Sequence, residues 1–269
     1  MTSDFTIVEA DDVLHLVLSR SDKLNAINLD MWNALHEVTA RLRDTDHLRA
    51  LLVTAEGRFF SAGIDLNGAL APDPALVRQP SNFRRWYRQG IGSLHALGDE
   101  WEAIEKPICV GFQGPVLGGA LELSLCADFR LATPNARLGL PEIKLGGIPG
   151  SGGTSRLVRL AGPHWARWMI LANRQVDAEQ ARNIGLVHDV LPEANFTAAC
   201  LAFARDLATM PPEAFAAGKL AIELAADLGR GQARHVERLT VSGLVGGVEY
   251  EQAMRAMQER LSGKTEPSS

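Results

Sequence analysis

Cysteine is scarce in this chain of 269 residues: only Cys109, Cys126 and Cys200 are present, and no two form a Cys-x-x-Cys pair. Each lies in an apolar stretch, so we expect buried, reduced thiols rather than a disulfide framework. The seven histidines form no His-x-x-x-His pair and no His/Cys cluster. The common sequence patterns of metal sites are therefore absent, and we expect no metal.

Long apolar runs and an excess of basic residues are also missing. No apolar run reaches the roughly 20 residues of a membrane span, and the first residues, MTSDFTIVEADD, are acidic instead of resembling a signal peptide. The net charge of −5 argues against broad binding to nucleic acid. We therefore expect a cytoplasmic protein with no nucleic-acid or membrane partner.

The hydrophobic patterning predicts a mixed α/β chain. Residues 5–10 and 13–20 alternate in polarity around Asp11-Asp12, which predicts a hairpin, and Asn28 precedes an amphipathic stretch as a helix N-cap would. Other segments predict the remaining elements: a helix at 29–44, strands at 49–55 and 108–114, two short strands within 127–140, helices within 83–106, at 118–126 and from 153 onward with a break at 186–193, and an irregular loop at 69–82.

The order of these elements is typical of one α/β domain with a helical C-terminal portion. We divide the chain into a core of residues 1–192, a C-terminal helical region of residues 193–262 and a polar tail of residues 263–269.

A single carboxylate interrupts the apolar stretch PVLGGALELSLCADF at residues 115–129. An unpaired carboxylate inside a core costs several kcal/mol or takes up a proton. Glu122 is therefore either a solvent-facing residue of a helix or a group whose burial serves a function.

Two further stretches are rich in small residues. The glycines of residues 138–157 complete neither a phosphate-binding loop, a dinucleotide fingerprint nor a nucleophile elbow. They predict either a tight loop or a turn feeding a helix at about Gly153, whose N–H groups face an anion or a polarised oxygen. In the other stretch, Ser61-Ala62-Gly63 follows a buried strand and would let a ligand approach the backbone, while Asp65 is suited to capping the next turn.

These stretches together resemble the crotonase family, the enoyl-CoA hydratase/isomerase superfamily. Residues 61–66 (SAGIDL) resemble its AGxDL signature, residues 114–123 (GPVLGGALEL) its NGxxxGGGxEL segment, and residues 141–154 its PE(I/V)xLGxxPGxGGT segment. Weaker matches, in the family's order, are residues 21–28, Asp128, residues 177–181 and residues 185–187.

The resemblance implies a crotonase-like spiral of β-β-α turns with a C-terminal helical trimerisation region, in trimers that often pair into hexamers. Residues 231–261 are apolar enough to need a partner surface. We therefore expect a homotrimer or a homohexamer.

The resemblance also implies the site. An acyl-CoA thioester would have its oxygen held by the backbone N–H groups of Ile64 and Gly119, with Glu122 handling water and Glu142 the α-proton. No separate cofactor is expected, because coenzyme A is part of the substrate. The residues implied in acyl-CoA binding are Lys23, Ala26, Ala62, Gly63, Asp65, Leu66, Gly118 and Gly150.

Three positions depart from the family pattern. Asn67 stands where a lysine often helps to bind the CoA phosphates, Gln113 replaces an asparagine, and Ala120 replaces a glycine. Lys23, or a basic residue from a neighbouring subunit (Lys219 or Arg260), would have to replace the missing lysine. The aromatic residues of 69–106 either shape the acyl pocket or belong to the core: Phe83, Trp86, Tyr87 and Trp101.

Both glutamates are present, and this favours hydration of a trans-2-enoyl-CoA to a 3-hydroxyacyl-CoA. Two carboxylates in one partly dry cleft can keep one protonated and one ionised, as water addition needs. Family members that only shift double bonds commonly keep the glutamate matching Glu142 and lose the one matching Glu122. An enoyl-CoA isomerase, another acyl-CoA hydratase or lyase, and a non-catalytic acyl-CoA-binding protein stay as alternatives.

Overall fold

The structure is a computed structural model that describes residues 3–67, 70, 73–89 and 94–262. It divides into two compact units, residues 1–209 and residues 210–269. Helix α8 (Phe196–Ala208) packs on strands β2 (Val13–Leu18), β3 (Ala50–Ala55) and β4 (Ile108–Phe112) and so belongs to the first unit.

The expected N-terminal hairpin and the capped helix are both present. Strands β1 (Phe5–Ala10) and β2 (Val13–Leu18) pair antiparallel. Helix α1 (Leu29–Asp44) begins after Asn28, whose Oδ1 accepts a hydrogen bond from the Met31 N–H at 3.0 Å. This side chain satisfies one of the N–H groups that a helix start leaves without a partner.

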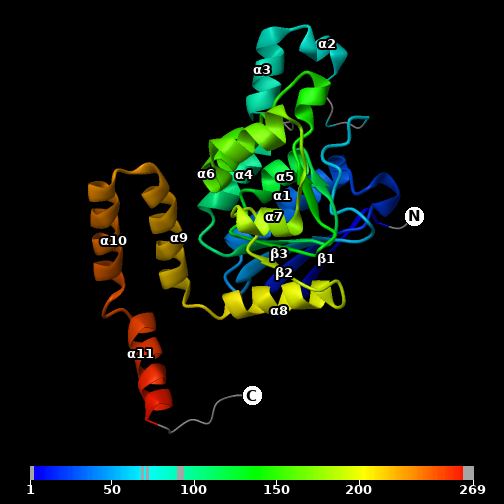
Figure 1. The fold of residues 1–269 in the computed structure, drawn as a ribbon. Helices are drawn as coiled ribbons and strands as arrows, with labels where there is room; N and C mark the ends of the chain where they lie inside the picture. Colours follow the sequence, from blue (N-terminus) through cyan, green and yellow to red (C-terminus); the bar gives the residue numbers. More distant parts are fainter. Residues whose placement is uncertain (1–2, 68–69, 71–72, 90–93, 263–269) are drawn as a thin grey trace. The chain divides into compact units, whose positions relative to one another are not determined.

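A six-stranded sheet forms the centre of the first unit, in the order β1-β2-β3-β4-β6-β9. After the β1–β2 hairpin every neighbouring pair is parallel. Leu51 and Val53 of β3 belong to the larger core, whereas Ala50 and Leu52 belong to a second core with residues of α8. Helix α8 lies below β2 and β3 in Figure 1. Burial on both faces explains why these strands read as continuous apolar runs. The four strands of this sheet beyond the hairpin are β3 (Ala50–Ala55), β4 (Ile108–Phe112), β6 (Phe129–Ala132) and β9 (Asp189–Val190).

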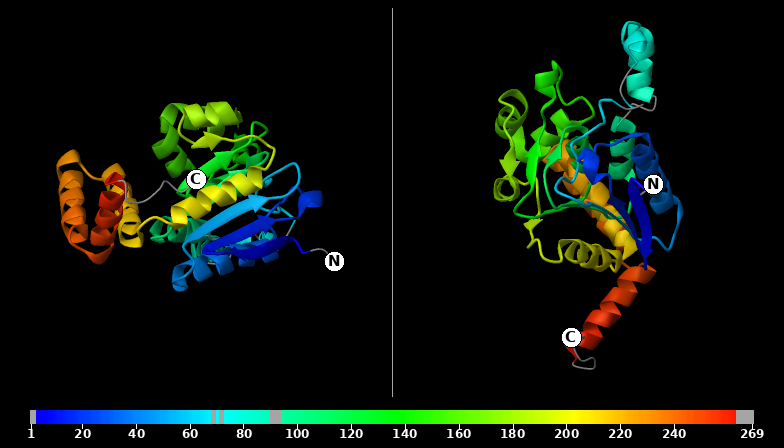
Figure 2. Two further views of the ribbon diagram at one scale, coloured as in Figure 1. Left: turned by 90° about the horizontal axis from the view of Figure 1, so that it is seen from below. Right: turned by 90° about the vertical axis from the view of Figure 1, so that its right-hand side faces the viewer.

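A second, three-stranded sheet runs in the order β5-β7-β8, and from β4 to β7 successive strands alternate between the two sheets. Strand β4 in the large sheet is followed by β5 in the small one and then by helix α5; β6, β7 and α6 repeat this pattern. Figure 2 shows this part of the ribbon from two further sides, with its colours following the sequence. The expected spiral of β-β-α turns is therefore confirmed, and the two short strands within 127–140 belong to different sheets. The bounds are β5 Val116–Leu117, α5 Gly119–Ser124, β7 Arg137–Gly139, α6 Gly153–Ala166 and β8 Val176–Asp177.

The stretch between β3 and β4 is more helical than the sequence analysis predicted. Pro74 and Pro80 each begin a helix inside the expected loop, α2 (Pro74–Val77) and α3 (Pro80–Gln89). Proline suits a first helical turn because the N–H that it lacks has no helical partner there. Helix α4 (Leu94–Ala103) follows, and the remaining short elements are η1 Ser21–Lys23, η2 Glu142–Leu145, the π-helical turn η3 Arg167–Leu171 and α7 Ala178–Asn183.

The second unit is built from three helices, α9 (Pro212–Asp227), α10 (Arg230–Leu244) and α11 (Val248–Leu261), and none of them has a buried residue. Its exposed large apolar side chains are Met210, Leu220, Ile222, Leu239, Val241, Val245, Val248, Tyr250, Met254, Met257 and Leu261. Within the described part of the chain, no helix has both the length and the apolar character to cross a membrane. The expected polar tail, residues 263–269, lies outside the described residues.

Candidate active site

A cavity of about 330 Å³ in the first unit brings the three motif segments together. Of the residues named from the sequence, Ala62, Gly63, Ile64, Leu66, Gly118, Gly119, Glu122 and Glu142 all line it. Glu122 and Glu142 reach the same cavity from different turns of the spiral, one on α5 and the other on η2. The sequence expectation of one shared cleft for the two carboxylates is met by the structure.

Two backbone N–H groups in this lining, those of Ile64 and Gly119, have no acceptor among the described residues. Ile64 is bracketed by a parallel bridge, in which Gly63 O accepts from the Ile27 N–H and the Asp65 N–H donates to Ile27 O, at 2.8 and 3.0 Å. In such a bridge the N–H of the central residue points away from the partner strand. Among the hydrogen bonds of the described residues, none uses the N–H of Ile64 or of Gly119.

Glycine at position 63 allows these two donors to lie close together. Gly63 has φ +101°, and a Cβ on it would lie 2.9 Å from the Leu117 carbonyl oxygen and 3.5 Å from the Gly119 nitrogen. A side chain here would separate the two segments and strain the backbone. The small residues of Ser61-Ala62-Gly63 therefore serve a close backbone approach.

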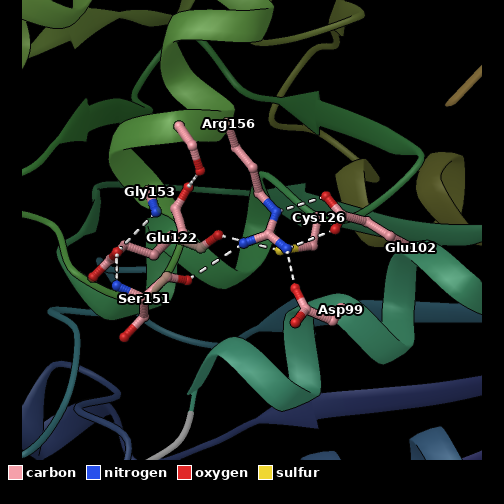
Figure 3. A network of polar contacts seen from close by, with 9 residues as sticks. Asp99, Glu102, Glu122, Cys126, Ser151, Gly153 and Arg156 are labelled. Carbon is pink, nitrogen blue, oxygen red and sulfur yellow. Dashed lines mark hydrogen bonds and ion pairs between the residues drawn. The ribbon is translucent and has the colours of Figure 1, made fainter. Parts of the chain in front are cut away.

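The Glu122 carboxylate is held by the glycine-rich turn. The residue is 4% exposed, and its Oε2 accepts hydrogen bonds from the Ser151 N–H at 2.7 Å and from the Gly153 N–H at 2.9 Å (Figure 3). Gly153 begins α6, so the positive end of that helix faces the carboxylate. The anion expected at this turn is thus a side chain of the same protein.

Burial and these hydrogen-bond donors shift the pKa of Glu122 in opposite directions. Burial raises the pKa of Glu122, while the N–H groups of Gly153 and Ser151 and the charges of His95 and Arg156 hold it down. The net pKa lies above the ordinary glutamate value. Only glycine fits at 153, because a Cβ there would lie 2.6 Å from the Glu122 Cγ.

Glu142 has a different environment in the same cavity. Its Oε2 is buried, and no hydrogen-bond partner for it exists among the described residues. Burial raises the pKa of Glu142 to about 7, and the negative charge of Glu122 adds to the shift against a hydrogen bond from Glu142's own N–H. Near neutral pH the cavity therefore holds one carboxyl stabilised by two backbone donors and one that takes up a proton easily, an arrangement suited to acid–base chemistry.

Apolar and aromatic side chains make up the rest of the cavity. Phe83, Trp86 and Tyr87 enter it from α3, which selects the pocket alternative for these three residues over the core alternative. Trp101 instead belongs to the core, where its Nε1 donates to Thr39 Oγ1 at 2.8 Å. The other apolar lining residues include Trp32, Leu66, Leu70, Leu94, Pro141 and Leu145.

Four of the residues implied in acyl-CoA binding do not line the cavity: Lys23, Ala26, Asp65 and Gly150. Asp65 forms an ion pair with Arg20, and Gly150 packs so closely on Tyr87 that a Cβ would lie 2.3 Å from the phenol oxygen. Lys23 is exposed, and its positive charge is one of the smaller influences that lower the pKa of Asp65, after the hydrogen bonds from Arg20 and the Asn67 N–H.

Two buried polar residues, Asn25 and Ser61, shape the Ile64 loop through hydrogen bonds that the sequence analysis did not predict. Asn25, fully buried, donates from Nδ2 to the carbonyls of Glu56 and Phe59, each at 2.8 Å. Ser61 donates to the Asn25 carbonyl at 2.7 Å and accepts from the Gly63 N–H at 3.1 Å. Asn25 lies in one of the weaker motif matches, which was the only sequence signal for this role.

The spiral of β-β-α turns around a cavity with two carboxylates defines an enzyme-like protein of the crotonase class. A family model described as "Enoyl-CoA hydratase/isomerase" matches residues 9–264, and the chain belongs to this family. The sequence expectation of crotonase family membership is confirmed.

Individual relatives agree with this assignment. The chain is 34% identical over 239 residues to a 2,3-dehydroadipyl-CoA hydratase of Escherichia coli K12, covering 87% of this chain and 89% of that protein. It is 32% identical to an enoyl-CoA isomerase/hydratase of Mycosarcoma maydis, covering 94% and 92%. A crystal structure of an enoyl-CoA hydratase from Bacillus anthracis superimposes with a TM-score of 0.84 at 26% identity, covering 96% of this chain and 97% of that one.

Proposed function

We propose that this protein is an enoyl-CoA hydratase that adds water to a trans-2-enoyl-CoA and gives a 3-hydroxyacyl-CoA. The observation that carries the proposal is the unequal pair of carboxyls in one cavity, with Glu122 bound by two backbone N–H groups and Glu142 buried with a pKa of about 7. Water addition needs a base at the β-carbon and an acid at the α-carbon, and this pair supplies both.

The N–H groups of Ile64 and Gly119, which have no acceptor among the described residues, form the proposed oxyanion hole. Negative charge develops on the thioester oxygen as water attacks, because the double bond becomes an enolate. Preorganised donors aimed at that oxygen contribute about 3–4 kcal/mol each to transition-state stabilisation in comparable sites. Gly119 begins α5, so the positive end of this short helix adds in the same direction.

The two glutamates then move two protons. Ionised Glu122 takes one proton from water while the water oxygen bonds to the β-carbon. Protonated Glu142 gives its proton to the α-carbon, and the enolate returns to a thioester. One water is consumed, and proton exchange between the carboxyls and solvent restores the starting state.

The cavity lining also indicates whether the acyl chain of the substrate carries a charge. Among the described residues that line it, the only charged side chains are the two glutamates, and most of the others are apolar or aromatic. A carboxylate at the far end of an acyl chain would lose its hydration there without gaining a cation. We therefore infer an uncharged acyl chain.

Two alternatives make different use of the same site. An isomerase needs one carboxyl to carry a proton between two carbons, and the Mycosarcoma maydis relative is named for both activities. A non-catalytic acyl-CoA-binding protein has no use for two carboxyls of different basicity. The paired glutamates favour the hydratase over both.

The decisive experiment compares wild-type protein with Glu122→Gln and Glu142→Gln on 2-enoyl-CoA and 3-enoyl-CoA substrates in isotopically labelled water. We expect the wild type to add one labelled oxygen to the 2-enoyl-CoA. Each single variant should lose about 10²–10⁴-fold in turnover, and the double variant should be little worse than the poorer single one, because the two groups act together.

Glu105→Gln is the matched control, since Glu105 is exposed and outside the cavity lining. An active Glu122→Gln variant, or a product without label, would favour the isomerase. Tight acyl-CoA binding without turnover would favour the binding protein.

We further propose a homotrimer, or a hexamer of two trimers, in the cytoplasm. The exposed apolar side chains on the helices of residues 210–261 support assembly, and three buried thiols suit a reducing compartment. Acyl-CoA is the only small-molecule partner proposed, with Lys23 as a candidate contact for the CoA phosphates because it is exposed.

A further inference from the structure

Arg156 is a buried cation directly behind the turn that holds Glu122. Its side chain is 10% exposed and comes from the first turn of α6. Its Nη1 donates to the Ser151 carbonyl at 3.4 Å, and the N–H of Ser151 in turn donates to the Glu122 carboxylate. Ser151 thus connects the guanidinium of Arg156 to the Glu122 carboxylate (Figure 3).

The turn and the guanidinium fit each other closely. Gly152 has φ +95°, and a Cβ on it would lie 1.7 Å from Arg156 Nη1. The guanidinium occupies the space beside this glycine, and this limits how far the turn can relax. A change in the Arg156 side chain would therefore act directly on the geometry of the Ser151 and Gly153 donors.

Helix α4 anchors the other side of the guanidinium. Arg156 Nε and Nη2 donate to the two carboxylate oxygens of Glu102, both at 2.6 Å, and Nη2 also donates to Asp99 at 2.7 Å. A bidentate pair of this kind fixes orientation as well as charge. The same helix contributes Leu94 to the cavity lining, so the ion pair links the cavity wall to the Glu122 turn.

We propose that Arg156 is a positioning residue, which fixes the 151–153 turn against α4 and thereby sets the orientation and ionisation of the Glu122 carboxylate. The expected effect of Arg156 on turnover rests on the proposed function, whereas its effect on the orientation and ionisation of Glu122 does not. Lysine cannot replace it fully, because a single ammonium lacks the planar fork that reaches Glu102, Asp99 and Ser151 together.

Several charged or titratable groups act on Glu122 and define the expected pH effect. Arg156 from α6 and His95 from α4 lower the pKa of Glu122, and Glu142 from η2 faces the same cavity. Burial raises the pKa of Tyr87 from α3, and the negative charge of Glu122 adds to this shift. Removing the Arg156 cation leaves the Glu102 and Asp99 charges unbalanced, so the pKa of Glu122 should rise.

The test compares Arg156→Gln, Arg156→Lys and Glu102→Gln with wild type. For Arg156→Gln we expect kcat to fall about tenfold or more, KM to change much less, and the acid limb of the kcat–pH profile to move up by about half a unit or more. Arg156→Lys should keep the acid limb near its wild-type position and still lose turnover, because it retains charge and loses the fork.

A double-mutant cycle separates positioning from general destabilisation. In the Glu122→Gln background, Arg156→Gln should cost little further turnover, because the carboxylate that it positions is gone. Arg130→Lys is the matched control: Arg130 is also buried, but it donates to the Leu186 and Ala127 carbonyls away from the cavity. It should lower thermal stability and leave the acid limb unchanged.

A folded Arg156→Gln variant with near-wild-type kcat and an unmoved acid limb would overturn the proposal. So would a double-mutant cycle in which Arg156→Gln costs as much turnover in the Glu122→Gln background as it does in wild type. If Arg156→Gln does not fold, Arg156→Lys and Glu102→Gln decide it by the same measurements. The Glu122 pKa can also be followed without turnover, by NMR of carboxyl-labelled glutamate assigned with Glu122→Gln. A shifted titration in a protein that does not hydrate would support the Arg156 proposal and reject the hydratase.

Discussion

Arg20 and Asp65 form an ion pair between Nη1 and Oδ2 at 2.8 Å, although they are 45 residues apart in the chain. The same Nη1 donates to the Ala26 carbonyl at 2.9 Å, and Asp65 Oδ1 accepts from the Asn67 N–H at 3.0 Å. Asp65 and Arg20 therefore connect the segment that follows Ile64 to the segment of residues 20–26. Its capping role, one of the two suggested by the sequence, is the one that the structure shows.

This ion pair predicts a pH-dependent loss of stability in Asp65→Asn. Arg20 and the Asn67 N–H lower the pKa of Asp65 below its ordinary value of 3.8. The stabilisation is present above that value and is lost as pH falls through the lower folded-state pKa. We expect a lower Tm than wild type near pH 7 and a difference that shrinks below about pH 4.

Thermal unfolding of both proteins across this range measures the effect. Asp206→Asn, a change at an exposed aspartate of α8, is the control and should show no such trend. A Tm difference that is equal at all pH values would mean that the charge of Asp65 contributes nothing.

Glu142 predicts a pH dependence of the opposite sign. Its folded-state pKa of about 7 lies above the ordinary value of 4.5, so the folded protein binds a proton more tightly than the unfolded chain does. Wild-type stability therefore falls as pH rises through this window. Glu142→Gln has no charge to bury, and we expect it to be more stable than wild type near pH 8, with little difference near pH 5.

Parallel melting curves of Glu142→Gln, Glu105→Gln and wild type would test this. The Glu105→Gln curve should follow wild type, since Glu105 is exposed. A Glu142→Gln protein that is destabilised at high pH would show that the carboxylate is well solvated in the folded state.

Gly119→Pro tests the oxyanion hole by removing one donor. Gly119 is the first residue of α5, a position where proline is compatible with a helix. We expect a loss of turnover of about 10²-fold or more, because the N–H aimed at the thioester oxygen is absent. Gly119→Ala keeps the N–H and is the matched variant, although its Cβ would press on Ile64 Cγ1 at 2.9 Å.

Circular dichroism must show the same helix content in both Gly119 variants. If the proline variant is folded and as active as the alanine variant, the Gly119 N–H has no part in the reaction.

The C-terminal unit predicts self-association. Residues such as Ile222, Leu239 and Val248 are each more than two-thirds exposed, at 75%, 73% and 73%. Many exposed apolar side chains on neighbouring helices indicate a surface that a partner covers in water. We expect a trimer or a hexamer by light scattering at micromolar concentration, and Leu239→Asp should shift the distribution toward smaller species. A monomeric wild type at that concentration would contradict the prediction.

The sequence alone was enough for much of this protein. The alternation of residues 5–18 determines the hairpin, Asn28 determines where α1 begins, and the motif glycines identify the crotonase family. These features depend on short-range physics, namely strand periodicity, helix capping and glycine conformations, which neighbouring residues specify.

Only the tertiary structure decided what each polar group faces. The glycine-rich turn binds Glu122, Asp65 binds Arg20, and Arg156 meets Glu102 and Asp99 on another helix. These partners lie far apart in the chain, and no local pattern couples them, because their approach depends on how the turns of the spiral stack. Burial, and with it the raised pKa values of the two cavity glutamates, is likewise a property of the packed molecule, since desolvation depends on every element around the carboxyl.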